Sequence, residues 1–355
     1  MKYHLLRYLK EYGQKTFREM PFSEVDALLL SQLSYLKFDG IVPGLGRQPS
    51  VGWEEIRNHP RFEHLFDDKI YGETYRRIFD LIHDSRRYGK LRLNYFVSRT
   101  EEQQESQFAA VTIFVGESSI FVSYRGTDES LTGWKEDFNM SFMDSVPSQR
   151  RAVSYLLNVA RYTEGRLILG GHSKGGNLAV YAGSYAPEKV QKRIRRIYSF
   201  DGPGFRKEFY ERDGFLRMRK RFCKIVPEDS WIGMLLANYP RYRVVRSYGK
   251  GVIQHDLLRW KIRDGRFVYR EKIYHKSSRR MQALNGWLES LSRDQISSMV
   301  EALYQIFDGA HVSSVYDLVL APFQALRLLW QGFCALDQKS RKLVRMFLRK
   351  VIRYM

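Results

Sequence analysis

The feature that most constrains this chain is a serine flanked by glycines between an apolar run and a helical segment. The apolar run covers residues 167–169, and the turn that follows reads Gly-His-Ser-Lys-Gly at 171–175. A serine on a sharp strand-to-helix turn adopts a strained backbone conformation and presents its hydroxyl at the end of the strand. The chain nearly contacts itself there, so the residues two before and two after must be small. We therefore predict that Gly171 and Gly175 support the turn and that Ser173 is a nucleophile.

Two backbone N–H groups are candidates to stabilise an oxyanion beside this serine. The helix after Ser173 directs its first N–H groups and its positive dipole end toward the site, which makes the N–H of Lys174 the first candidate. The second comes from the end of an earlier predicted strand, at Ser-Tyr-Arg-Gly-Thr-Asp, residues 123–128. Gly126 allows a bend there, and Thr127 offers both its N–H and its hydroxyl. The alternative interpretation of this segment is an ordinary turn at the end of a strand.

A nucleophilic serine needs a histidine base, and three histidines follow it in the sequence. His255 lies in a loop just after the predicted strand 242–247, which is where a base belongs in such a sheet. His275 lies beyond a predicted hairpin, and His311 lies in the helical tail. We therefore favour His255. His172 adjoins the nucleophile and should point away from it, as a packed or hydrogen-bonded core residue.

The acid that orients the base has three candidates. Asp229 follows the predicted strand 223–226, and Asp201 follows the predicted strand 197–200. We favour Asp229 because it is nearer to the histidine in the usual chain order of nucleophile, acid and histidine. Asp201 is the alternative acid. If it is not the acid, it is simply a turn-forming residue before Gly-Pro. Glu228 is the third candidate.

The hydrophobic patterning divides the chain into three regions. We predict a helical N-terminal extension packed on the core (1–90), an α/β core (91–275) and a helical C-terminal region with a basic amphipathic tail (276–355). Ser23 begins a capping-box pattern that ends at Asp26. In the middle region a predicted hairpin, turning near 116–119, is followed by short strands that alternate with helices. This order predicts an α/β fold with a mixed, largely parallel sheet.

The chain is strongly basic, with 59 Lys+Arg against 39 Asp+Glu and a formal net charge of +20. Such a charge favours anionic partners. Residues 189–222 hold twelve basic and four acidic residues, and residues 339–355 hold seven basic and no acidic ones. The tail is amphipathic and resembles a helix on an anionic membrane surface, but we favour the alternative, a terminal helix docked on the protein. Nucleic-acid binding by 189–222 is less favoured, because no nucleic-acid-binding motif accompanies this segment.

Several classes of protein are excluded by what the sequence lacks. Two cysteines, Cys223 and Cys334, cannot form a disulfide framework or a cysteine-built zinc site. Neither a metal motif nor a phosphate-binding loop occurs, so we expect no metal and no cofactor. The N-terminus lacks the apolar core of a signal peptide, and residues 315–336 are interrupted by charges and Pro322. We therefore expect a cytoplasmic protein that can be peripheral at a membrane.

Six segments taken together resemble the Mbeg-like family of bacterial proteins, which is related to the lipase class 3 α/β-hydrolases. They are residues 25–36, 124–128 with Trp134 and Asp137, 171–179, 201–204, 226–230 and 254–256. The resemblance implies a serine hydrolase, lipase-like or esterase-like, that cleaves an acyl ester of a small-molecule or lipid-like substrate through an acyl-enzyme.

The resemblance also assigns roles to residues. It implies Ser173 as nucleophile, Asp229 as acid, His255 as base, and Thr127 with Lys174 as oxyanion donors. It suggests that Arg125 and Asp137 pair to hold the oxyanion loop. The sequence departs from the lipases at Lys174, where they usually have leucine. The competing hypothesis is a weakly active or inactive hydrolase scaffold that binds anionic membrane or nucleic acid through its basic patches.

Overall fold

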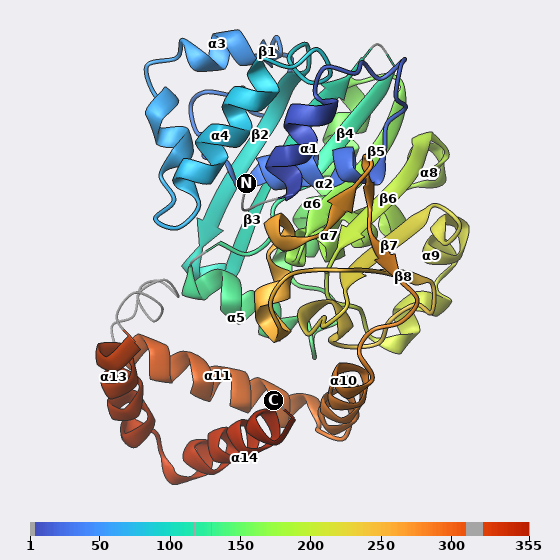
Figure 1. Ribbon diagram of the computed structural model, residues 1–355. Coiled ribbons are helices and arrows are strands. Elements are labelled where there is room, and N and C mark those ends of the chain that lie inside the picture. Colours follow the sequence, from blue (N-terminus) through green and yellow to red (C-terminus); the bar gives the residue numbers. More distant parts are fainter. Residues whose placement is uncertain (1–3, 117, 129, 310–321, 355) are drawn as a thin grey trace.

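A central β-sheet organises the protein (Figure 1), whose computed structural model describes residues 4–116, 118–128, 130–309 and 322–354. Within these ranges the sheet has nine strands in the order β1-β2-β3-β4-β5-β6-β7-β8-β11. The strands are β1 (Val51–Gly52), β2 (Arg92–Glu101), β3 (Ser106–Val115), β4 (Ser119–Tyr124), β5 (Arg166–His172), β6 (Ile194–Phe200), β7 (Phe222–Pro227), β8 (Tyr242–Val245) and β11 (Tyr269–Arg270). A separate hairpin joins β9 (Ile262–Arg263) to β10 (Arg266–Phe267).

The predicted mixed sheet is confirmed. Strands β4 to β8 pair in parallel, while β1 to β4 and the pair β8–β11 are antiparallel. The hairpin expected near 116–119 joins β3 to β4, although residue 117 lies outside the described residues. Strand β2 has no counterpart among the strands expected from the sequence. Because β4 to β8 run parallel, their carboxyl ends meet at one edge of the sheet, where α5 (Leu131–Asn139) follows β4.

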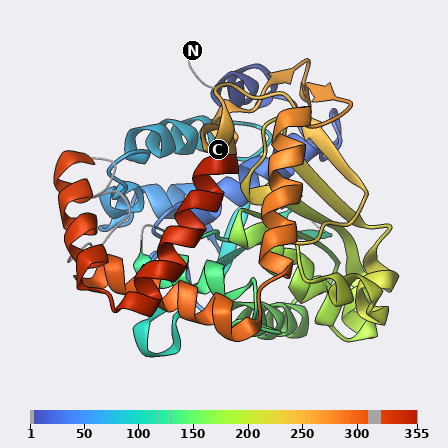
Figure 2. The same cartoon turned by 90° about the horizontal axis from the view of Figure 1, so that it is seen from below.

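Helices cover both faces of the sheet (Figure 1). One face carries α1 (His4–Tyr12), α2 (Glu24–Gln32), α3 (Trp53–Arg57) and α4 (Gly72–His83). The other carries α6 (Pro147–Tyr162) and α7 (Lys174–Tyr185), with α8 (Glu188–Arg193) and α9 (Asp213–Met218) beside them. Beyond the carboxyl edge lie α10 (His275–Glu289), α11 (Arg293–Gly309), α13 (Pro322–Ala335) and α14 (Gln338–Tyr354), seen from below in Figure 2.

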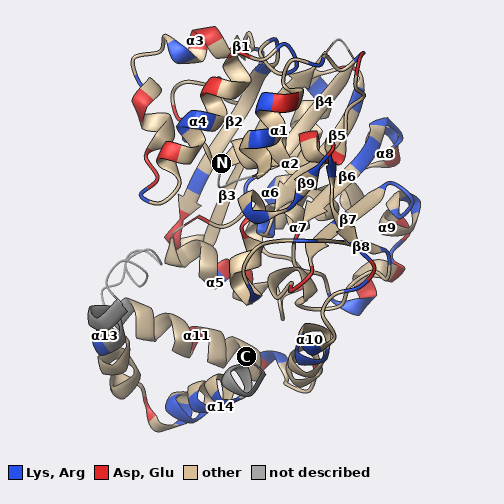
Figure 3. Ribbon diagram, viewed as in Figure 1, with Lys and Arg blue, Asp and Glu red and all other residues tan. Residues whose placement is uncertain are grey.

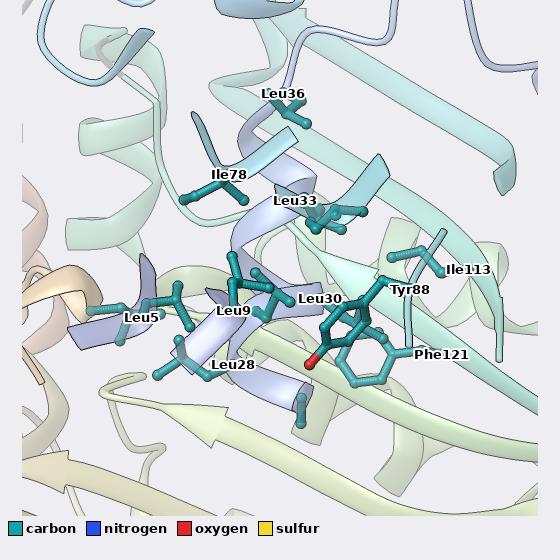
Figure 4. Packing of buried hydrophobic residues seen from close by; sticks show 14 of the residues in the cluster. Leu5, Leu9, Leu28, Leu30, Leu33, Leu36, Ile78, Tyr88, Ile113 and Phe121 are labelled. Carbon is teal, nitrogen blue, oxygen red and sulfur yellow. The ribbon is translucent and has the colours of Figure 1, made fainter. Parts of the chain in front are cut away.

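The N-terminal helices share one hydrophobic core with the sheet. Helix α2 begins at the predicted capping box, in which Ser23 and Asp26 bond each other's backbone N–H groups. Leu28 and Leu30 of this helix pack in the same cluster as Phe121 of β4 (Figure 4). The division into regions 1–90, 91–275 and 276–355 remains a prediction, but the first region has no separate core.

A buried ion pair ties this extension together. The side chains of Asp26 and Arg87 are fully buried, and Arg87 Nη2 lies 2.6 Å from Asp26 Oδ2. Arg87 also donates to the carbonyls of Thr16 (3.2 Å) and Met20 (2.7 Å), while the Tyr8 hydroxyl donates to Asp26 (3.1 Å). One guanidinium thus connects the segment between α1 and α2 to the residues that follow α4.

We predict that Arg87→Met lowers the free energy of unfolding by about 3–5 kcal/mol, because it leaves the Asp26 carboxylate buried without its cation. Urea denaturation measures this change. Arg86→Met is the matched control, since Arg86 is exposed and lies 4.0 Å from Glu19, at the limit of an ion pair. The control should change stability by less than about 0.5 kcal/mol. Equal losses in both variants would contradict the role assigned to Arg87.

Candidate active site

The turn between β5 and α7 has the geometry predicted for a nucleophile elbow. Ser173 has φ 56° and ψ −130°, a left-handed conformation that is costly for a residue with a side chain. A Cβ added to Gly175 would lie 2.1 Å from the carbonyl oxygen of Tyr124, and one added to Gly171 would lie 2.3 Å from the Gly175 carbonyl carbon. The glycines are therefore required by close backbone contact, and Ser173 stands partly exposed at the sheet edge.

His255 and Asp201 form the closest acid–base pair at this edge. His255 lies in the 3₁₀ helix η6 (Gly251–His255), and its Nδ1 is 2.6 Å from Oδ2 of Asp201. A carboxylate only accepts, so Nδ1 carries a proton, and Nε2 is the nitrogen that can act as a base. Asp201 is fully buried, and its other oxygen accepts from Ser230 Oγ at 2.5 Å. The carboxylate is thus held from both sides.

The prediction that Asp229 contacts His255 is wrong. Asp229 Oδ2 accepts from the backbone N–H of Gly251 at 2.6 Å, and its Oδ1 accepts from Ser277 Oγ. Its own backbone N–H donates to Gln254 Oε1 at 2.9 Å. Asp229 therefore braces the loop that precedes His255. The inference from chain order failed because β6, which ends at Phe200 just before Asp201, lies next to β5 in the sheet, whereas β7 is one strand further away.

The other candidate acid and bases lie apart from this pair. Glu228 accepts from Arg270 at 3.2 Å and from the backbone N–H of Ser247 at 3.4 Å. His275 is exposed at the beginning of α10. His311 lies outside the described residues.

His172 is a buried core residue, as expected, and it also contacts the loop of the base. Its Nε2 bonds the backbone carbonyl of His255 at 3.0 Å, and its Nδ1 bonds the Tyr35 hydroxyl at 2.9 Å. Because a carbonyl only accepts, Nε2 is the protonated nitrogen and Nδ1 accepts from Tyr35. Burial lowers the pKa of His172 well below its ordinary value, so the ring is neutral. The sequence offered no signal that Tyr35, from the N-terminal region, reaches this site.

The predicted oxyanion loop, residues 125–128, lies directly beside the elbow. A Cβ added to Gly126 would be 3.2 Å from the Cβ of Ser173, so the loop contacts the nucleophile closely. The Lys174 N–H, at the first position of α7, has no partner within the helix. The Thr127 hydroxyl donates to Asp137 Oδ2, and among the described residues no hydrogen bond engages the Thr127 N–H. Both N–H groups can thus serve an oxyanion.

The suggested pairing of Arg125 with Asp137 is wrong. Arg125 Nη2 instead lies 3.2 Å from Ser98 Oγ and 3.4 Å from Asp128 Oδ2. Asp137 holds the oxyanion loop through the Thr127 hydroxyl. Burial raises the pKa of the Asp137 carboxyl to about 6, and the nearby charge of Lys174 opposes that rise.

The described contacts join His255 to Asp201 but include no hydrogen bond between Ser173 Oγ and His255. The base nevertheless lies close to the elbow, because the ring of His255 is 4.4 Å from the ring of His172, the residue before Ser173, measured between centroids. Hydrogen bonds between nucleophile and base are often longer before substrate binds. Within the described residues no cluster of three or more His, Cys, Asp or Glu residues is arranged to hold a metal ion.

An α/β sheet with a strained serine elbow at its carboxyl edge defines the class of α/β-hydrolases. A family profile, described as Mbeg1-like, matches residues 82–305. The protein belongs to the Mbeg1-like family.

Several solved lipases resemble this chain in fold. The Rhizomucor miehei lipase, solved as a propeptide complex, is 15% identical with a TM-score of 0.38, and the match covers 68% of each chain. Lipase II from Rhizopus niveus is 14% identical with a TM-score of 0.36, covering 73% of this chain and 88% of the lipase. M37 lipase is 14% identical with a TM-score of 0.35, covering 59% of this chain and 69% of the lipase. No curated protein sequence matches this chain. At this level of similarity the lipases carry no information about the activity of this chain.

We predict that Gly175→Ala destabilises the protein by about 3 kcal/mol or more, because the new methyl group meets the Tyr124 carbonyl. Thermal denaturation followed by circular dichroism measures the change. Gly286→Ala is the matched control, since Gly286 is an exposed glycine inside α10 with no atom within 4 Å of an added Cβ. That control should stabilise by up to about 1 kcal/mol, the difference in helix propensity. A tolerated Gly175→Ala would contradict the close packing of the elbow.

Proposed function

We propose that this protein is a carboxylic ester hydrolase that uses Ser173 as nucleophile, His255 as base and Asp201 as the orienting acid. The observation that carries the proposal is the 2.6 Å contact between His255 Nδ1 and Asp201 Oδ2, on a loop beside the elbow. Asp201 keeps the imidazole in the tautomer whose Nε2 is unprotonated and stabilises the imidazolium that forms during the reaction. Asp229 supports the loop and takes no part in proton transfer.

The reaction proceeds in two halves. Ser173 Oγ attacks the ester carbonyl carbon while His255 Nε2 removes the hydroxyl proton, and the carbonyl π electrons move onto the oxygen. The N–H groups of Lys174 and Thr127 stabilise that oxyanion. As the tetrahedral intermediate collapses, the alcohol leaves with the proton from His255, and an acyl-enzyme remains. A water deprotonated by His255 then attacks the acyl carbon. The bond between that carbon and Ser173 Oγ breaks, His255 returns the proton to Oγ, and the carboxylic acid is released.

The proposed substrate is an ester of a carboxylic acid. An acyl ester, small or lipid-like, is the substrate that a serine nucleophile with a histidine base and two oxyanion donors can cleave. We also propose that the protein is located in the cytoplasm, in line with its two cysteines, neither of which forms a disulfide in the structure. Within the described residues, no helix combines the length and the apolar content needed to span a bilayer.

We predict that Ser173→Ala abolishes hydrolysis of short p-nitrophenyl esters and labelling by a fluorophosphonate probe. Asp201→Asn should lower kcat by about 10³–10⁴-fold, because the amide favours the wrong imidazole tautomer. Asp229→Asn is the matched control with a much smaller effect, since its amide oxygen still accepts from the Gly251 N–H. The reverse ranking of the two aspartates would refute Asp201 as the acid, and activity in Ser173→Ala would refute the mechanism.

A second candidate function is binding to an anionic membrane surface through α14. Part of the apolar face of this helix is docked: Val344 is fully buried in a cluster with α11, and Phe347 packs near Trp287, while Leu348 is 43% exposed. The helix therefore presents a basic face (Figure 3), on which Lys342 and Arg345 are exposed. Trp330 of the neighbouring helix α13 is 65% exposed, which suits the interface of a membrane.

We predict that the protein sediments with phosphatidylserine vesicles at low salt and less so as salt rises, because the attraction is screened. Lys342→Glu/Arg345→Glu should weaken binding by about tenfold or more, since each basic residue contributes about 1 kcal/mol. Arg219→Glu/Lys220→Glu is the control, with the same change of charge at exposed positions just after α9. Equal weakening by both pairs would show that net charge alone, and not α14, drives binding.

A further inference from the structure

The side chain after the nucleophile is a lysine that is fully buried. Lys174 begins α7, yet its ammonium turns away from Ser173 toward β3 and α5, with its side chain at 0% exposure. It donates to the backbone carbonyl of Gln107 at 2.9 Å, to Gln107 Oε1 at 2.6 Å and to Glu136 Oε2 at 3.1 Å. An ammonium has three protons, so these three acceptors use its full capacity.

Glu136 anchors the other side of this contact. Its side chain is also fully buried, and it accepts from the backbone N–H groups of Gln107 (3.0 Å) and Ser148 (2.8 Å). The pair Lys174–Glu136 therefore connects the elbow, the beginning of β3, helix α5 and the beginning of α6. A buried ion pair costs desolvation free energy, and replacing it with apolar residues of similar volume often leaves a protein equally stable or more stable. Packing alone gives no reason for a lysine here.

The same helix α5 holds the oxyanion loop. Asp137 follows Glu136 in the chain, and its Oδ1 lies 4.0 Å from Lys174 Nζ. Its Oδ2 accepts from the hydroxyl of Thr127. A continuous chain of polar contacts thus runs from Lys174, whose N–H is one oxyanion donor, to Thr127, whose N–H is the other.

We propose that the Lys174 side chain is a positioning residue that joins the elbow to α5 and thereby sets the separation of the two oxyanion donors. The inference rests on the proposed ester hydrolase function and deepens it. Oxyanion donors must lie at hydrogen-bonding distance, about 2.7–3.1 Å, from the position of the developing charge, so a small shift between elbow and loop lowers the rate strongly. The ammonium acts through geometry and through its charge on Asp137, and it does not touch the substrate.

The charge of Lys174 also controls the protonation of Asp137. The charged groups that face Asp137 are Lys174 and His255, which lower its pKa, and Glu136, which raises it; burial is the largest effect and raises it to about 6. Above that pH the ionised carboxylate holds the Thr127 hydroxyl by a charge-assisted hydrogen bond, and below it this bond weakens. Removing the Lys174 charge raises the pKa of Asp137 further, so the acid limb of the pH–rate profile moves to higher pH.

Lys174→Met in the full-length chain tests this proposal. We expect kcat on short p-nitrophenyl esters to fall about tenfold to 100-fold with little change in KM, because the donors act in the transition state. The acid limb of kcat/KM should move up by about one pH unit. Lys135→Met is the matched control: Lys135 lies on the same helix, is 8% exposed and pairs with Glu105 and Glu301 instead. This control should leave the pH profile unchanged.

A second variant separates folding from positioning. If Lys174→Met does not fold, Lys174→Met/Glu136→Gln removes both buried charges, and the glutamine oxygen can still accept from the Ser148 N–H. In this variant kcat stays low, because the ammonium that joins the elbow to α5 is still missing. The acid limb moves less than in the single variant, because loss of the negative Glu136 lowers the pKa of Asp137. Wild-type kcat in a folded Lys174 variant overturns the proposal.

A readout without turnover separates this inference from the proposed function. The carboxyl ¹³C resonance of Asp137, assigned by its loss in Asp137→Asn, is titrated in the Ser173→Ala background with and without Lys174→Met. A higher pKa of Asp137 in the Lys174 variant supports the coupling, and an unchanged pKa overturns it. If the wild-type chain shows no labelling that depends on Ser173, the ester hydrolase proposal fails, and the titration alone decides the role of Lys174.

Discussion

The site depends on one backbone constraint, the turn at which β5 becomes α7. Ser173 occupies a left-handed conformation there, and Gly171 and Gly175 let the chain pass within van der Waals contact of itself and of β4. A strained residue persists only where its surroundings determine it. Here the surroundings are the parallel strands on either side, because Ser173 N–H bonds the carbonyl of Phe200 at the end of β6 at 3.0 Å. The same strand end carries Asp201, so the elbow and the acid are positioned together.

The base is held by a second set of contacts that is independent of the acid. Asp229 accepts from the backbone N–H of Gly251, and Gln254 donates to the carbonyl of Gly249 while accepting from the Asp229 N–H. His172 bonds the carbonyl of His255 itself. These bonds set where the imidazole can point, and Asp201 then selects its tautomer. Asp201 and Asp229 follow the ends of neighbouring strands, and for this reason both are candidate acids in the sequence. Only one of them faces the ring.

Buried charges recur in this protein as connectors between segments far apart in the chain. Asp26 and Arg87 join the N-terminal helices to each other, and Lys174 and Glu136 join the elbow to α5 and α6. In each pair the remaining hydrogen-bond capacity is taken up by backbone groups and by further side chains, such as Tyr8 at Asp26 and Gln107 at Lys174. Additional hydrogen bonds of this kind are the condition under which a buried ion pair is tolerated. Such pairs give each segment one well-defined position, whereas apolar contacts alone allow small shifts.

The sequence by itself determined the class of fold, the elbow and the candidate base. Hydrophobic periodicity marks strands and helices locally, and the need for glycine on both sides of Ser173 is a local steric requirement that a short motif can express. Only the tertiary structure decided which acid faces His255, where the Lys174 ammonium goes and how Asp137 reaches Thr127. These outcomes depend on strand order in the sheet and on contacts with Tyr35, Gln107 and Glu136. Such contacts join residues tens of positions apart, and a single sequence does not encode side-chain direction across that distance.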